Sequence, residues 1–392
     1  MNNYSLKNVL KKNTMIVVMF VVYIFFAIMT NGNIFTPSQF SALITQNAYV
    51  FVLGTGMLMC MLTGGNIDLS VGSFVCFIGA IAGVVSVLHQ VNTPLSLLIV
   101  LGVGIVYGVL LGYLIAFLNI PPWIATLAGY LAFRGAGTEI LTKVSTTSAI
   151  SNFPEPLLKM FSGKVLESNG GFNIPCIIAG VVAIALISVM NFKSRENKVK
   201  KGYEAEPKKY VIGKTIFEDA IIGLLTYMFA VDGGIPVVLV WVIAIMVIYS
   251  FICEKTVIGR HFMTVGGNAE TARLSGINNK LVMFVAYLNM SVLTVIASLM
   301  VTARFKAANS FAGVNFEMDA ISACIVGGVS AYGGAGTVGG MAIGATLIGI
   351  INLGMSLMGI DQNWQKVVKG GVLLAAVVFD IWTKKNSGKV KK

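Results

Sequence analysis

Long apolar runs follow one another from Thr14 almost to the end of this 392-residue chain, with short polar breaks between them. A helix needs about 20 mostly apolar residues to cross a bilayer. The chain is 56% apolar and 11% charged, whereas soluble domains carry roughly a quarter charged residues. A soluble fold of this size cannot bury so much apolar surface. The sequence therefore predicts an all-α integral membrane protein.

Twelve segments are candidate spans, which predicts a polytopic bundle of about 10–12 transmembrane helices. The segments are 14–30, 40–62, 67–88, 94–119, 123–141, 173–192, 216–231, 236–253, 280–303, 318–332, 337–358 and 364–382. Two of them, 216–231 and 318–332, are short for a full crossing. No small-residue cleavage site follows the first run, so we expect a retained helix rather than a signal peptide.

Basic residues predict how the chain is oriented in the membrane. Of the 28 Lys and Arg residues, 20 lie in residues 1–13, 193–214, 255–280 and 384–392. Lys and Arg are enriched in cytoplasmic loops, so these four segments and both termini are expected in the cytoplasm. This distribution explains the net charge of +12 without nucleic-acid binding.

Two longer polar segments connect the predicted spans. Residues 142–172, rich in Ser, Thr, Asn, Gly and Pro, are expected to form an extracytoplasmic loop. Residues 193–214, in which Lys and Glu are intermixed around Pro207, are expected to form a solvated cytoplasmic linker. Neither is long enough to fold as a domain. We therefore expect residues 1–392 to form one membrane domain.

A glycine-rich polar break separates two apolar runs at residues 63–73. It contains Asp68, the only carboxylate between Thr14 and Val87. Ionisable groups at membrane depth are costly and usually functional, so Asp68 is a candidate for contact with a transported molecule. Alternatively, Asp68 caps the following helix through backbone amides. The break predicts a broken helix with Gly64, Gly65, Asn66, Asp68, Ser70 and Gly72 as its structural and functional residues.

A second glycine-rich interruption occupies residues 327–340 and begins with Gly327 and Gly328. Interrupted spans in the two halves of a transporter often reflect an inverted repeat, so we hypothesise two broken or re-entrant segments related in this way. The interruption includes a G-x-G-x-x-G spacing, but its predicted flanks are membrane helices rather than the strand and helix of a dinucleotide site. Glycines at every fourth residue (336, 340 and 344; 104, 108 and 112) instead indicate close helix packing.

A third polar feature is the predicted cytoplasmic segment 259–279. Asn268 is a suitable N-cap for a short helix over 269–274, in which Glu270 and Arg273 are spaced i, i+3. A short surface helix of this kind would be a rigid contact for a partner protein. The alternative is a solvated loop between two membrane helices.

Three motifs make the sequence similar to a known family. The Ile-Asp-Leu-Ser-Val-Gly-Ser run at 67–73, the run at 266–277 and the Ile-Val-Gly-Gly-x-Ser run at 325–330 resemble ATP-binding-cassette (ABC) importer permeases for ribose, xylose and related monosaccharides. The run at 126–135 and an extra apolar insert at about 173–231 resemble the xylose and multiple-monosaccharide type. Asn66 resembles an insertion relative to ribose permeases.

The resemblance implies a non-catalytic permease subunit in the cell membrane. Such permeases pair as two copies, bind a separate ABC ATPase and receive sugar from an extracytoplasmic binding protein. ATP and Mg²⁺ would belong to the ATPase, since this chain contains no P-loop sequence, and no cofactor is expected in this chain. By resemblance, the residues that dock the ATPase are Gly266, Gly267, Asn268, Ala269, Glu270, Arg273, Leu274 and Gly276.

A path for a neutral sugar needs scattered Asn, Ser, Thr and aromatic groups rather than strong charges. The candidates in the predicted spans are Asn47, Thr126, Asn289, Ser291, Asn352 and Trp364. Each of these could instead bond a neighbouring helix. Four charged residues near predicted external ends are candidates for contact with the binding protein or for interfacial anchoring: Arg134, Arg304, Glu317 and Asp319.

Other functions remain as alternatives. An ABC permease for another small polar solute, such as a nucleoside, would have the same features. A secondary sugar transporter would need several buried acidic or His residues as a proton relay, and the predicted spans offer essentially Asp68. An intramembrane enzyme or a metal site would need clustered catalytic groups or ligands, yet His89 and His261 lie in different loops.

Overall fold

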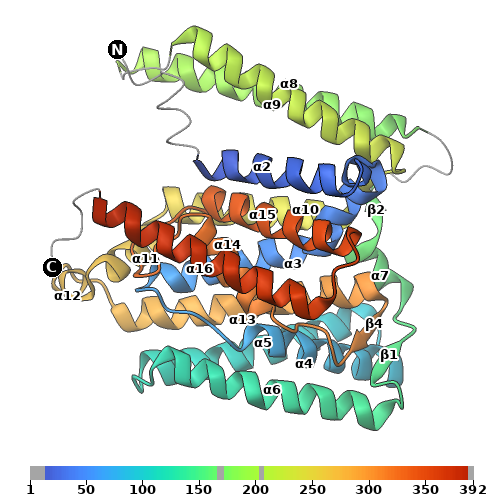
Figure 1. The fold of residues 1–392 in the computed structure, drawn as a ribbon. Coiled ribbons are helices and arrows are strands. Elements are labelled where there is room, and N and C mark those ends of the chain that lie inside the picture. Colours follow the sequence, from blue (N-terminus) through green and yellow to red (C-terminus); the bar gives the residue numbers. More distant parts are fainter. Residues whose placement is uncertain (1–13, 166–171, 203–206, 387–392) are drawn as a thin grey trace.

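The computed structural model describes residues 14–165, 172–202 and 207–386. Most of these residues are helical, and the longer helices lie side by side along one direction (Figure 1). The helices are α2 (Thr14–Met29), α3 (Pro37–Leu62), α4 (Val71–Gly83), α5 (Thr93–Ala116), α6 (Pro122–Val144), α7 (Glu155–Ser162), α8 (Ile174–Lys200), α9 (Lys208–Val231), α10 (Val237–Lys255), α11 (Val257–Gly267), α12 (Ala269–Leu274), α13 (Asn279–Phe305), α14 (Phe316–Val326), α15 (Val338–Leu357) and α16 (Gln362–Asn386). Short helical turns η1 (Asn33–Phe35) and η2 (Val84–Leu88) follow α2 and α4.

Seven helices of the described chain are long and apolar enough to cross a membrane. They are α3, α4 with η2, α5, α8, α10, α13 and α15. The prediction of an all-α, polytopic membrane protein is therefore confirmed. Helices α2, α6, α9, α14 and α16 coincide with the other predicted spans but are shorter or more polar. The prediction of 10–12 crossings stays a prediction.

The two ends of the bundle differ in structure. Helix α12 lies at one end, called here the α12 end, and strands β1, β2 and β4 lie at the opposite end, called the strand end (Figure 1). Strand β1 (Ala149–Ser151) pairs antiparallel with β4 (Ala307–Asn309), and β2 (Lys164–Val165) pairs with β3 (Ile235–Pro236). The predicted loop 142–172 thus contains short strands and α7, which tie it to distant parts of the chain.

Glycine spacing sets how closely the central helices approach. Helix α13 packs against both α3 and α5. A Cβ atom at Gly108 of α5 would lie 2.9 Å from the Leu288 Cα of α13, and one at Gly112 would lie 3.0 Å from the Phe284 carbonyl oxygen. Such distances leave no room for a side chain, so the predicted close packing at 104, 108 and 112 is confirmed.

Helices α14 and α15 also approach through glycine. A Cβ atom at Gly344 would overlap the Ala323 carbonyl oxygen, and Gly327 and Gly340 face each other in the same way. The predicted span 318–332 is wrong at its second boundary because α14 ends at Val326. Gly328, with φ +84°, then turns the chain out of helical geometry. The helices are thus interrupted at both glycine-rich segments, while re-entry into the membrane and an inverted repeat stay predictions.

Helices α8 and α9 form a hairpin at the edge of the bundle (Figure 1). Only 11% of the apolar window of α8 is buried. The predicted linker 193–214 is helical at both ends because α8 continues to Lys200 and α9 begins at Lys208. An ion pair of 2.8 Å between Glu196 and Lys200, spaced i, i+4, supports the last turn of α8. The charged composition of this segment therefore marks extended helix ends rather than an irregular linker.

Candidate coupling site

The short helix α12 is held by caps at its base. The Asn268 Oδ1 accepts a hydrogen bond of 2.9 Å from the Thr271 amide, as the sequence predicts for an N-cap. The Asn279 Nδ2, at the start of α13, donates to the Ala269 carbonyl oxygen at 2.7 Å. The Ala272 side chain is fully buried. Gly276, with φ +82°, turns the chain away after the helix. The predicted short helix is confirmed, and it is anchored to its neighbours.

The outer face of α12 is exposed. Glu270 and Arg273 form an ion pair of 3.5 Å in which both side chains are more than two-thirds exposed (76% and 71%). Leu274 is 77% exposed. An exposed pair of this kind contributes little to stability, so it does not explain the shape of the helix. This face presents the apolar Leu274 beside the charged Glu270 and Arg273, all on an anchored helix. Such a surface is suited to binding a protein partner.

Behind α12, Gly266 at the end of α11 contacts the first glycine-rich break. A Cβ atom at Gly266 would overlap the Leu62 carbonyl oxygen and would lie 2.8 Å from the Gly64 nitrogen and 2.6 Å from the Gly334 nitrogen. All three are backbone atoms, so no side chain can move to make room. By contrast, a Cβ atom at Gly267 would meet nothing within 4 Å. A side chain at Gly266 would therefore collide with backbone, whereas one at Gly267 would enter open space.

The second glycine-rich segment closes the same contact. A Cβ atom at Gly333 would overlap the Gly64 backbone, and one at Gly65 would overlap the Ala331 carbonyl oxygen. The Gly334 amide donates to the Leu62 carbonyl oxygen at 3.1 Å. We call Gly64, Gly65, Gly266, Gly333 and Gly334 the glycine junction. At this junction, both helix breaks meet the segment that carries α12.

Sequence reasoning predicted Gly64, Gly65 and Gly266 as site residues but missed Gly333 and Gly334. The missed pair lies within the glycine-rich stretch 327–340, and nothing in its local pattern distinguishes these two glycines from their neighbours. Gly327 and Gly328, which were predicted, lie at the end of α14. Gly327 packs against Gly340 of α15, and a Cβ atom at Gly328 would meet nothing within 4 Å.

Buried hydrogen bonds fix the chain between α3 and α4. Asp68 is 1% exposed, and its Oδ1 accepts from the Ser70 amide at 2.8 Å and from the Ser70 hydroxyl at 2.6 Å. The Tyr107 hydroxyl of α5 donates to the Ser70 Oγ at 2.8 Å. Asp68 thus orders the residue directly before α4 rather than an amide inside its first turn. Tyr107 was not predicted, because it looks like an ordinary residue of an apolar helix.

Two further residues of this break have defined neighbours. The Asn66 Nδ2 donates to the Thr63 Oγ1 at 3.1 Å and to the Thr63 carbonyl oxygen at 3.3 Å, which folds the turn after α3 upon itself. A Cβ atom at Gly72 would overlap both the Gly313 carbonyl oxygen and the Glu317 carboxylate. Only glycine allows α4 to begin this close to the residues before α14.

A polar cavity of about 730 Å³ lies nearer the strand end, between α3, α13, α14, α15 and α16. It contains Asn47 and Asn352, and the Asn352 Nδ2 donates to the Asn47 Oδ1 at 3.1 Å. The structure thus brings together two of the six predicted path residues, which are 305 positions apart. Gln46, Asn315, Gln362 and Gln365 add further amide groups to the lining.

The other predicted path residues lie elsewhere. The Ser291 hydroxyl donates to the Gly104 carbonyl oxygen at 2.6 Å and joins α13 to α5. The Thr126 hydroxyl donates within its own helix, to the Pro122 carbonyl oxygen at 2.9 Å. Asn289 accepts from the Tyr249 hydroxyl, and Trp364 is 66% exposed. None of these four lines the cavity.

A buried ion pair lies in the wall of the cavity. The Lys369 ammonium is 2.9 Å and 3.0 Å from the two carboxylate oxygens of Asp319, and the Tyr49 hydroxyl donates to the Asp319 Oδ2 at 2.6 Å. Tyr49 stacks on Phe316 with a centroid distance of 3.6 Å. Asp319 is therefore fully bonded inside the protein.

The four charged residues expected near external ends have different surroundings. Asp319 and Glu317 are buried, at 2% and 3% exposure. The Arg134 Nη1 donates to the Ser310 and Ala312 carbonyl oxygens at 3.2 and 2.9 Å. Arg304 lines the cavity and lies over the Phe305 ring at 4.9 Å. Burial of the two acids is inconsistent with a direct surface contact to another protein.

Comparison with known proteins assigns the family. A profile described as branched-chain amino acid transport system / permease component matches residues 39–377. The chain is 31% identical over 383 residues to the xylose transport system permease protein XylH of Haemophilus influenzae, covering 97% of this chain and 99% of that protein. It is also 31% identical to XylH of Escherichia coli K12, covering 95% and 92% of the two chains. The ribose import permease protein RbsC of Escherichia coli K12 is 28% identical, covering 89% of this chain and 87% of RbsC.

No solved structure matches this chain. The family profile covers most of the sequence, including both glycine-rich segments, α12 and nearly all of the cavity lining. The identity to XylH extends over almost the full length of both proteins. The chain is therefore a multi-pass membrane protein that belongs to the branched-chain amino acid transport system / permease component family.

Proposed function

We propose that this chain is the transmembrane permease subunit of an ABC importer for a monosaccharide, xylose or a related sugar. The proposal is supported by relatives named as xylose and ribose permeases that align over most of the chain. Sugars are neutral and rich in hydroxyl groups, and the amide-lined cavity offers the donors and acceptors that hydroxyl groups require. The subunit forms the path and carries out no chemistry of its own.

In this proposal, α12 docks a separate ATPase that binds ATP and Mg²⁺. The observation that carries the assignment is the glycine junction, because it joins the base of α12 to both helix breaks through backbone contacts. A partner that moves α12 also moves Gly266. Because Gly266 touches the backbone of Gly64 after α3 and of Gly334 before α15, these two segments move with it. Closure of the ATPase would in this way change the arrangement of α4 and α14, which the two breaks connect to α3 and α15.

The remaining partners follow from the same orientation. The α12 end faces the cytoplasm, in keeping with the basic residues of 193–202, 208–214 and 255–280 that lie there (Figure 1). By the same rule, both termini are on the cytoplasmic side. The strand end then faces outward and receives sugar from an extracytoplasmic binding protein. Two copies of the chain pair around the path, which begins at the cavity that contains Asn47 and Asn352. Tyr49 and Phe316 add aromatic surface to this cavity, against which the apolar face of a sugar ring can pack.

Transport by the reconstituted complex tests the proposal directly. The chain is placed in vesicles with its ATPase and binding protein, and uptake of labelled xylose, ribose and a nucleoside is measured. We expect uptake of a pentose that requires both ATP and the binding protein, because this chain has no ATP site of its own. Uptake driven by a proton gradient without ATP would contradict the importer mechanism. Uptake of the nucleoside alone would contradict the substrate class.

A charge reversal on α12 is expected to separate the permease from its ATPase. Glu270→Lys breaks the pair with Arg273 and places a repulsive charge on the exposed docking face. We expect the amount of ATPase that co-purifies with the permease to fall by about tenfold or more, as for a charge central to an interface. Uptake should fall in parallel, while the thermal melting temperature of the permease stays unchanged because the pair is exposed.

The matched control for this variant is Glu139→Lys. Glu139 forms a comparable exposed pair with Lys143 at 3.0 Å, and its side chain is 62% exposed, but it lies on α6 at the strand end. We expect this control to retain the ATPase. Equal loss of ATPase in both variants would mean that α12 is not the docking helix.

A further inference from the structure

Among the described residues, the α8–α9 hairpin has few neighbours at the α12 end. Helix α8 packs mainly on α9, and α9 reaches the rest of the bundle mainly through α3. The buried apolar cluster that joins the hairpin to α3 contains Cys176, Phe229 and Ala230, all at the strand end. At the α12 end, α8 therefore depends on α9 and on its surroundings in the membrane.

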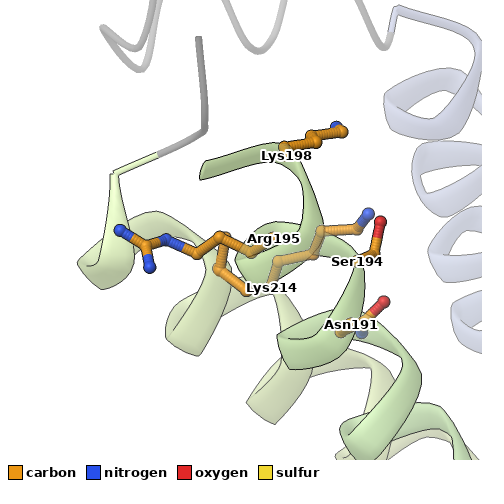
Figure 2. Close-up of a pocket in the computed structure, with 6 residues that line it drawn as sticks. Asn191, Ser194, Arg195, Lys198 and Lys214 are labelled. Atoms are coloured by element: carbon orange, nitrogen blue, oxygen red, sulfur yellow. The ribbon is translucent and has the colours of Figure 1, made fainter. Parts of the chain in front are cut away.

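The two helices form a small basic pocket at this unsupported end. A cavity of about 80 Å³ lies between Asn191, Ser194, Arg195 and Lys198 of α8 and Val211 and Lys214 of α9. Figure 2 shows the Lys198 and Lys214 amino groups and the Ser194 hydroxyl on one side of the hairpin. A second, open cavity of about 540 Å³ shares Ser194 and Lys198 and adds Lys193 and Lys201. Among the residues that the structure describes, five basic side chains and no carboxylate line the two cavities.

The nearest carboxylates already have partners. The Glu218 Oε2 accepts from the Asn191 Nδ2 at 2.7 Å, one turn deeper in the hairpin. The Asp219 Oδ2 accepts from the Ser188 hydroxyl at 2.8 Å, and Glu196 pairs with Lys200. Lys214 is 3.8 Å from the Glu218 Oε1, a long contact that leaves its ammonium accessible. Glu218 and Asp219 thus join α9 to α8, while Lys198 and Lys214 stay at the surface.

Apolar side chains lie directly below the basic pocket. Met190 is 67% exposed, Ile216 63% and Phe217 57%. They continue the exposed apolar surface of α8 and α9 toward the strand end. A ligand that fits both regions needs an anionic group for the pocket and apolar chains for the helix surface. A soluble phosphate supplies only the first of these, whereas a phospholipid supplies both.

We propose that the α12 end of the α8–α9 hairpin binds the headgroup of an anionic phospholipid, with the phosphate between Ser194, Lys198 and Lys214 and the acyl chains along Met190 and Phe217. Basic pockets between membrane helices on the cytoplasmic side favour such headgroups. The bound lipid takes the place of the protein neighbours that α8 lacks at this end. The inference rests on membrane insertion and on the positive-inside orientation, and it is independent of the transported molecule.

Lipid binding by the purified full-length chain tests the proposal. Detergent-solubilised protein is titrated with fluorescent phosphatidylglycerol and, separately, with phosphatidylcholine of the same acyl chains. We expect tighter binding of phosphatidylglycerol. In the double variant Lys198→Gln, Lys214→Gln, we expect its affinity to fall by roughly 25-fold, at about fivefold for each basic group removed.

The matched control is the double variant Lys208→Gln, Lys209→Gln. It removes the same charge from the same hairpin but none of the pocket residues. We expect its affinity to fall by less than about fivefold, since distant charges are largely screened by salt. Thermal melting of both variants establishes that the hairpin is intact, because all four side chains are exposed.

Three results would overturn the proposal. Equal loss of affinity in both double variants would mean that diffuse positive charge, and not the pocket, attracts the lipid. Equal binding of phosphatidylglycerol and phosphatidylcholine would mean that the pocket does not select an anionic headgroup. Displacement of the lipid by millimolar inorganic phosphate would indicate a site for soluble phosphate. Because none of these measurements involves sugar, failure here leaves the proposed transport function unaffected.

Discussion

Replacing Gly266 with alanine is expected to abolish ATP-driven sugar uptake, whereas the same change at the adjacent Gly267 is expected to leave uptake within about twofold of wild type. The new methyl group at 266 would overlap the Leu62 carbonyl oxygen, and the backbone nitrogens of Gly64 and Gly334 are within 3 Å of it. Overpacking of this kind typically costs about 1–3 kcal/mol when the surroundings can relax. Here the surroundings are backbone, so the junction itself must open.

The pair of variants is informative because only the environment differs. Gly266 and Gly267 are the last two residues of α11, and each change adds one methyl group. The methyl group at 267 enters open space. Uptake is measured in reconstituted vesicles, together with ATP hydrolysis and the amount of folded permease. We expect the Gly266→Ala complex to hydrolyse ATP with little transport, since α12 can still dock but no longer moves the two breaks. Equal uptake by the two variants would mean that the glycine junction does not transmit motion.

Local sequence patterns predicted α12 well. Its N-cap, its length and the spacing of Glu270 and Arg273 follow from interactions within a few residues, and each was found as predicted. The glycine junction could not be predicted in the same way. It joins Gly65, Gly266 and Gly333, which are up to 268 positions apart, and a close backbone contact leaves no mark in the sequence except glycine itself. With 43 glycines in the chain, composition alone does not single out these positions.

Polar residues in membrane helices raised a similar difficulty. Asn47 and Ser291 are both polar groups in long apolar helices, so both were equally good candidates for path residues. The structure separates them, since Ser291 bonds the backbone of α5 while Asn47 meets Asn352 beside a cavity. The difference depends on which face of each helix is turned inward. Hydrophobic periodicity does not report that orientation when the helix is apolar on every side.

Among the charged residues, the prediction for Asp319 differs most clearly from the structure. Its place near the external end of a span suggested contact with a binding protein. A carboxylate at that depth can equally be buried if it finds a cation, and Lys369 supplies one from α16. The two residues are 50 positions apart and belong to helices whose contact cannot be read from the sequence. Loss of this ion pair should change the stability of the protein by a measurable amount.

Removing one member of the Asp319–Lys369 pair is expected to destabilise the protein strongly. The Lys369→Met variant leaves the Asp319 carboxylate, with a side chain only 3% exposed, without its cation. Breaking a buried ion pair in this way typically costs about 3–5 kcal/mol. We expect a lower melting temperature in detergent. The control is Lys366→Met, which removes a lysine from the same cavity lining, and it should melt close to wild type because no ion pair of Lys366 appears among the described residues.

Neutralising both partners is expected to recover most of this loss. In the double variant Asp319→Asn, Lys369→Met, the Tyr49 hydroxyl can still donate to an amide oxygen at position 319, and no uncompensated charge remains. Its melting temperature should exceed that of Lys369→Met, which is the non-additivity expected of interacting residues. Sugar uptake should also persist in the double variant, because a neutral sugar needs no charge and Asn47 and Asn352 are unchanged. A stable double variant that no longer transports would instead place Asp319 or Lys369 in direct contact with the sugar. Equal melting temperatures of Lys369→Met and Lys366→Met would show that the Asp319–Lys369 pair does not stabilise the fold.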